Sequence, residues 1–161
     1  MAKFIHTKGL DEVVKNLNVE IKQIEGRTLQ GLIRAGLMVL RSVEKYPPLT
    51  PVDLGNLRAS RFLITSNGSV GMGRNPTFNG PDAGQIAGDH GNAISYAESL
   101  AKSKKPSVAL GFAARYATAV HEKTGIVNWS RPGSGAKFFE KAIDANVQNM
   151  IKVKQEEVKI K

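Results

Sequence analysis

The residues best suited to chemistry are an adjacent histidine and glutamate, His121 and Glu122. They begin like the helical motif of zinc proteases, in which a second histidine four residues after the first binds the same ion from the same helix face. Gly125 stands at that position, so the spacing does not predict a metal site. His6 and His90 would become ligands only through tertiary contacts that the sequence does not reveal.

A glycine-rich stretch before Lys137 raises a second possibility, phosphate binding. Residues 133–135 read Gly-Ser-Gly and precede the expected start of a helix, where free backbone N–H groups can hold an anion. A nucleotide-binding loop needs lysine directly after its last glycine and a hydroxyl residue after the lysine, but Ala136 intervenes and Phe138 follows. No serine stands in the Gly-x-Ser-x-Gly elbow of hydrolases. We therefore expect no enzyme, no cofactor and no bound metal.

Composition and charge restrict the classes that remain. The 161 residues are 41% hydrophobic and 23% charged, which is typical of a soluble protein with a single core, and we expect one domain over residues 1–161. There is no cysteine, so disulfides and thiolate sites are excluded. No apolar run approaches the ~20 residues that span a bilayer, and the first residues lack the features of a secretory signal. The formal charge of +9 favours polyanionic partners such as nucleic acid or an acidic protein surface.

The candidate residues His121, Glu122 and Lys137 must be positioned by helices at both ends of the chain and by strands between them. Apolar residues at helical spacing predict a long helix over 10–43, with a kink or break near Gly26, and Pro47 and Pro48 should end it. Residues 61–65 and 69–72 are predicted strands, joined by the Asn-Gly turn at 67–68.

Farther along, residues 107–112 are a third predicted strand, 114–122 are helix-like, and a last helix begins at Ala136. Glycines without a clear period predict a long flexible loop over about 73–92, followed by a short helix or extended segment at 94–101. The lysine-rich residues 152–161 are expected to form a basic, solvated tail. The predicted fold class is α+β, with a small, mainly antiparallel sheet.

Three segments, residues 46–60, 116–125 and 138–142, resemble in this order the neck or tail-component family of long-tailed bacteriophages. The first, residues 46–60, is similar to the family's "P-x-x-T-P-V-D-T-G-x-L-R-x-S", with Leu54 in place of its threonine. The second, residues 116–125, is similar to "Y-A-x-x-V-E-x-G-T", with His121 before the glutamate and the glycine and threonine exchanged. The third, residues 138–142, is similar to "F-L-x-x-A" at the start of the family's last helix. The matching residues are Thr50, Pro51, Val52, Asp53, Gly55, Asn56, Leu57 and Arg58, then Tyr116, Ala117, Val120, Glu122 and Gly125, and last Phe138 and Phe139.

The resemblance implies a structural virion protein that joins the head to the tail, or completes the upper end of the tail, as a hexameric or twelvefold ring. It implies no catalysis. Its neighbours would be the portal or adaptor and the tail terminator or tail tube, with possible contact to viral DNA in the channel and none to a membrane. The protein would be made in the cytoplasm of the host bacterium and act in the virion. Two alternatives stay open: a small basic nucleic-acid-binding protein, and a hydrolase using His121 and Glu122.

The first segment also has a physical interpretation that does not depend on the family. Thr50 or Asp53 is suited to cap a helical turn over 54–59, with Pro51 tolerated at its entry. Gly55 would allow two backbones to approach closely. On this interpretation the segment turns the chain from the long helix into the sheet, with or without a partner.

Overall fold

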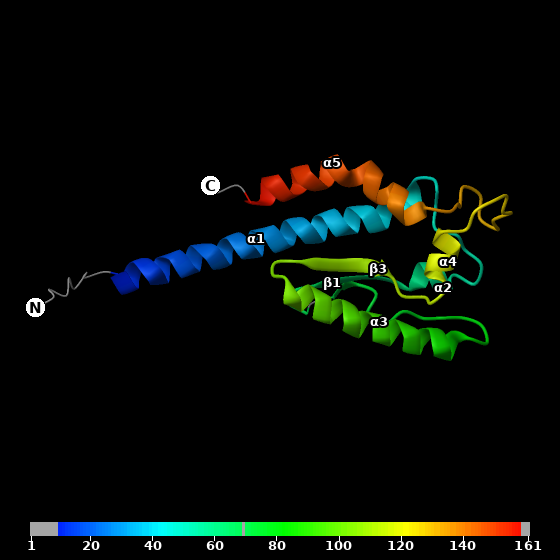
Figure 1. The fold of residues 1–161 in the computed structure, drawn as a ribbon, viewed down its shortest axis with the longest axis horizontal. Helices are drawn as coiled ribbons and strands as arrows, with labels where there is room; N and C mark the ends of the chain where they lie inside the picture. The colour runs from blue at the N-terminus through cyan, green and yellow to red at the C-terminus, as the bar shows by residue number, and fades with distance from the viewer. Residues whose placement is uncertain (1–9, 69, 159–161) are drawn as a thin grey trace, which may run out of the picture.

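A computed structural model describes residues 10–68 and 70–158 (Figure 1). The fold is α+β, as predicted, with a three-stranded sheet between helices. The helices and strands are α1 (Leu10–Lys45), α2 (Asn56–Ala59), β1 (Arg61–Thr65), β2 (Val70–Met72), α3 (Ala83–Ser103), β3 (Val108–Phe112), α4 (Ala117–His121) and α5 (Phe138–Val158).

Helix α1 is a single helix of 36 residues, and Gly26 does not interrupt it. A Cβ placed on Gly26 would contact nothing within 4 Å, so this glycine marks no close approach. The helix ends at Lys45 because Pro47 and Pro48 lack backbone donors and push the preceding residues out of the helical region. The predicted end of the long helix is therefore confirmed.

The sheet has the order β2-β1-β3, and both pairings are antiparallel. Gly68 has a φ of 75° and supplies the left-handed residue that the turn between β1 and β2 needs. The three predicted strands are thus confirmed. The third, β3, lies at an edge of the sheet, and its residues are half-buried throughout.

Successive residues of β1 point to opposite faces of the sheet and hold different helices. Leu63 is fully buried against α1, where a Cβ on Gly36 would lie 2.7 Å from the Leu63 side chain. Ile64 packs on the other face, in a cluster with Ile94 of α3. Figure 1 shows α1 and α3 on opposite sides of the sheet, with α5 along the far side of α1.

The prediction of a flexible loop over about 73–92 is wrong for the second half of this range. The loop ends at Asp82, and α3 runs from Ala83 to Ser103, including the segment that was predicted as short or extended. The glycines of α3, Gly84, Gly88 and Gly91, have no neighbour within 4 Å of an added Cβ. Their low helix propensity is offset by the burial of the opposite face of the helix. That face consists of Ile86, His90, Ile94, Ala97 and Ala101.

The tail predicted from residue 152 is helical in the part that the structure describes, although Lys152 and Lys154 are exposed, as predicted. Helix α5 continues to Val158 and lies against α1. A Cβ on Gly31 would lie 3.1 Å from Cα of Lys154, and Glu157 forms an ion pair with Arg34. Residues 159–161 of the predicted tail lie outside the described residues. None of the described helices is long and apolar enough to cross a membrane.

Candidate functional site

The three segments, residues 46–60, 116–125 and 138–142, meet at one end of the molecule (Figure 1). The first lies between α1 and β1, the second includes α4, and the third begins α5. Figure 1 shows α2, α4 and the first turn of α5 together at the end where α1 stops. Contacts, rather than sequence proximity, therefore bring the segments together.

Thr50 anchors the first segment to the end of α1. It is completely buried, and both its backbone N–H and its Oγ1 donate to the carbonyl oxygen of Val43, at 2.8 and 3.2 Å. Its own carbonyl accepts from Arg131 and Ser134, each at 3.4 Å. Thr50 therefore links α1 to the loop that precedes α5.

The predicted capping of a 54–59 turn is wrong. The helical turn is α2, Asn56–Ala59. Gly55 occupies its N-cap position, and no side chain forms a capping hydrogen bond there. Gly55 has a φ of 84°, and a Cβ there would meet nothing within 4 Å. This glycine is required for its left-handed conformation and not for a close approach of two backbones.

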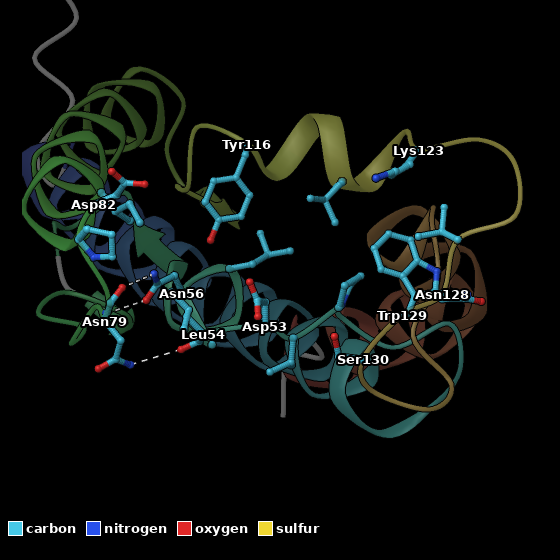
Figure 2. A pocket seen from close by; sticks show the side chains of 18 residues that line it. Asp53, Leu54, Asn56, Asn79, Asp82, Tyr116, Lys123, Asn128, Trp129 and Ser130 are labelled. Carbon is cyan, nitrogen blue, oxygen red and sulfur yellow. Dashed lines mark hydrogen bonds between the residues drawn. The ribbon is translucent and has the colours of Figure 1, made fainter.

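Asn56 ties the first segment to the loop between β2 and α3. The side chain is buried, its Nδ2 donates to the carbonyl of Asn79 at 2.8 Å, and its Oδ1 accepts from the Asn79 N–H at 2.8 Å. Asn79 in turn donates from its side chain to the carbonyl of Leu54 at 3.3 Å. Figure 2 shows these three bonds as dashed lines at one side of a cavity.

Glu44, near the end of α1, gathers three arginines. Its carboxylate lies 2.8 Å from Nε of Arg58, 3.3 Å from Arg61 and 3.0 Å from Arg131. Burial lowers the pKa of Arg61, and the neighbouring guanidinium groups lower it further, while Glu44 raises it. One carboxylate facing three guanidinium groups leaves an excess of two positive charges at this position.

A cavity of about 500 Å³ separates the first segment from the second (Figure 2). Tyr116 projects into it beside the first segment, and Trp129 enters from the loop after α4. Burial raises the pKa of Tyr116, the charge of Asp53 raises it further, and a hydrogen bond with the Leu57 backbone opposes both. The cavity is lined by Pro51, Val52, Asp53, Leu54, Gly55, Asn56, Leu57, Asn79, Pro81, Asp82, Ile86, Tyr116, Val120, Lys123, Val127, Asn128, Trp129 and Ser130.

Apolar side chains of all three segments share one core cluster. Leu57 of the first and Phe138 of the third are both buried there, and Tyr116, Ala117 and Val120 of the second pack against the cluster. The ring of Phe112 meets those of Phe138 and Phe139 edge to face, at centroid distances of 5.2 and 5.6 Å. Gly125, with a φ of 91°, lies in the turn after α4.

His121 and Glu122 join the second segment to the start of α5. The imidazole Nδ1 lies 2.7 Å from Glu122 Oε1, and Nε2 accepts the backbone N–H of Glu140 at 3.3 Å. This pairing places the imidazole proton on Nδ1. Hydrogen bonds from Lys137 and then His121 lower the pKa of Glu122, and the bonds to Glu122 and Glu140 raise the pKa of Lys137.

His121, Glu122 and Glu140 have side chains of the types that bind metal ions. One potential ligand atom from each residue lies within 4.8 Å of the other two. The Lys137 ammonium group binds both carboxylates, and both ring nitrogens are already hydrogen-bonded. A metal ion would have to displace the lysine and break the contact with the Glu140 N–H. The arrangement is therefore suited to fastening α4 to α5.

Several residues of this end were not among the predicted ones. Glu44, Asn79, Asp82, Trp129 and Arg131 all contribute contacts or line the cavity. Trp129 and Arg131 lie in a loop whose apolar residues have no regular spacing. Asn79 lies in a loop whose conformation depends on its hydrogen bonds with Asn56. In the sequence only the charge of Glu44, Asp82 and Arg131 and the size of Trp129 set them apart, and nothing marked Asn79.

No family model, curated protein or solved structure matches this chain.

Proposed function

We propose that this protein is a structural subunit of a long-tailed bacteriophage virion. It works as one member of a neck or tail-completion ring that joins the head connector to the tail. The observation that carries the proposal is the meeting of the three resembling segments at one end of the fold. Leu57, Tyr116 and Phe138, one from each segment, belong to or pack against a single core cluster.

Three polar residues of the first segment are occupied by structural bonds, which favours a structural role over catalysis. Thr50 holds the end of α1, Asn56 holds the loop over 73–82, and Arg58 pairs with Glu44. Each bond joins two separate elements or loops of the chain. A rigid end of this kind is suited to presenting a fixed surface to neighbouring subunits.

The proposed partners are further copies of this chain in a hexameric or twelvefold ring, with the portal or adaptor on one side and the tail terminator or tail tube on the other. Contact with viral DNA in the channel belongs to the same proposal. The charge of +9 would favour such contact. The protein would be made in the host cytoplasm and retained in the virion.

One observation favours the second candidate, a small basic nucleic-acid-binding protein. Arg58 is half-exposed beside Glu44, where the guanidinium groups outnumber the carboxylate three to one. Phosphate contacts of this kind weaken steeply as salt rises. Binding of the purified protein to duplex DNA over a salt series separates a phosphate-driven binder from a protein that associates through apolar contacts.

Deletion of the gene from its phage tests the proposed function. Lysates of the deletion strain should contain DNA-filled heads and separate tails, and expression of the wild-type chain in trans should restore joined particles. A complementing variant changed at an exposed residue of α3, Asn92→Ala, serves as the control and should also restore them. Joined, infectious particles without the protein would overturn the proposal.

A further inference from the structure

The N-terminal part of α1 projects beyond the rest of the molecule. The last described turns of α5 lie against Gly31, so α5 does not reach the preceding turns of α1. Figure 1 shows this end of α1 extending past the sheet, α3 and α5. We call residues 12–25 the arm.

The arm exposes large apolar side chains: Val13 is 63% exposed, Val14 48%, Leu17 57% and Ile21 44%. Val14, Leu17, Ile21 and Ile24 are spaced by three, four and three residues, which places them on one stripe that suits a helical partner. A single helix gains little stability in water without a packed face. The stripe therefore has the features of an interface that a single subunit leaves open.

Acidic side chains flank the stripe. At about 100° per residue, Glu20 lies on one edge of the stripe and Glu25 on the other. Lys15 and Lys22 lie off the stripe, beyond the edge that Glu25 marks. Each edge of the apolar stripe therefore carries a carboxylate, although the chain as a whole carries a charge of +9.

A groove of matching character lies between α1 and α5. It has a volume of about 620 Å³, with half-buried apolar side chains of Leu37, Met38 and Val153 in it. Arg34, Arg41 and Lys45 line it with basic groups. At about 1.5 Å per residue, the basic row from Arg34 to Lys45 is ~16 Å long and the apolar row of the arm ~15 Å.

We propose that the arm of one copy binds in the α1–α5 groove of a second copy. The apolar stripe would cover the groove's apolar residues, and Glu20 and Glu25 would face its basic residues. This inference rests on the proposed function, for which it supplies the contact between ring members. Because arm and groove are different surfaces of one chain, the contact can repeat head-to-tail, and such a contact forms a ring where the rotation between copies closes.

Pairing of two arms is the competing arrangement. In a parallel pair with the stripe at the core positions, Glu20 of one arm would face Glu25 of the other, and like charges at these positions destabilise the pair. Pairing of arms would also give a twofold dimer instead of a ring. The groove offers opposite charges and is the better partner.

The absence of cysteine allows a direct test by disulfide trapping. Full-length Ile21→Cys and Met38→Cys proteins are mixed and oxidised at high concentration, and the products are compared with those of each variant alone. The proposal predicts that the mixed dimer predominates. A matched pair, Lys22→Cys with Met38→Cys, moves the arm thiol about 100° around the helix, off the stripe, and should give little product. Dimers of Ile21→Cys with itself, or no cross-link at all, would overturn the proposal.

Charge reversal gives a second measurement by sedimentation velocity. Two double variants reverse the charge on one side of the contact: Glu20→Lys with Glu25→Lys in the arm, and Arg41→Glu with Lys45→Glu in the groove. Each should weaken self-association at least about tenfold, because like charges would then face each other. All four substitutions in one chain should restore association. Circular dichroism checks that each variant remains helical. Equal association of all variants would count against the groove contact, whereas separate heads and tails in the deletion strain would still support the virion role.

Discussion

Asn56 and Asn79 exchange a pair of 2.8 Å hydrogen bonds between a side-chain amide and a backbone N–H and carbonyl. The amide thereby substitutes for a strand partner and holds the 73–82 loop against α2. Because Asn56 is 5% exposed, water cannot readily replace the bonds. This contact sets one wall of the cavity that the first segment shares with Tyr116 (Figure 2).

Replacing this amide should destabilise the fold. We expect Asn56→Ala to lower the free energy of unfolding by about 1–3 kcal/mol, because the buried Asn56 amide loses two hydrogen bonds to the Asn79 backbone, each contributing about 0.5–1.5 kcal/mol. Denaturant unfolding measures the change, with Asn92→Ala on the exposed side of α3 as the control. Equal midpoints for the two variants would show that the Asn56 bonds contribute nothing.

Two glycines with similar backbone angles should respond differently to alanine. A Cβ on Gly73 would lie 1.9 Å from the carbonyl oxygen of Arg61, whereas a Cβ on Gly55 meets nothing within 4 Å. Gly55→Ala should cost about 1–2 kcal/mol for its left-handed conformation alone. Gly73→Ala should cost clearly more, since β1 and β2 must also separate. Thermal unfolding of both variants checks the order, and a less damaging Gly73→Ala would contradict it.

Stability at alkaline pH should depend on Tyr116. Burial and the charge of Asp53 raise the pKa of this phenol above its ordinary value, so the neutral form is favoured in the folded state. The contribution is present below the unfolded pKa of about 10 and is lost as the pH rises through the folded pKa. Between about pH 9 and 11, Tyr116→Phe should therefore lose less stability than the wild type.

Tyr96→Phe, changed at a tyrosine that is 66% exposed on α3, is the control for this pH series. It should follow the wild-type curve in denaturant unfolding. If Tyr116→Phe also followed that curve, the phenol would not be coupled to folding.

Shortening α5 should weaken the fold. A chain that ends after Ile151 loses Lys154 and Glu157, which pack on Gly31, and the ion pair with Arg34. We expect a loss of about 1–2 kcal/mol in the free energy of unfolding, within the range of changes that remove a packed contact. A chain that ends after Val158 is the control, and identical stability of the two truncated chains would mean that the last turns of α5 contribute no packing.

The sequence was sufficient for elements whose signals are local. The apolar period of α1 and the following prolines fixed its end, and the Asn-Gly pair at 67–68 located the hairpin. The first half of α3 lacked such a signal, because His90 occupies the centre of its buried stripe. His90 is 3% exposed and its Nε2 lies 2.6 Å from the carbonyl oxygen of Gly73, a contact that only the folded chain makes.

The candidate site was only partly predictable for the same reason. The motif residues were identified from the resemblance, but the cavity depends on Asn79 and Trp129, which enter from separate loops. The cluster around Glu44 joins residues of α1, α2, β1 and a late loop. Pairings across such separations leave no periodic pattern in a single sequence.

Electron microscopy of virions labelled with a gold-conjugated antibody against this protein tests the central claim most directly. The antibody is applied to intact particles of the phage that encodes the chain, and to particles from the deletion strain as the control. We expect label at the junction between head and tail on intact particles and none on the control. Label confined to another part of the virion, or protein found only in the unassembled fraction of the lysate, would contradict it.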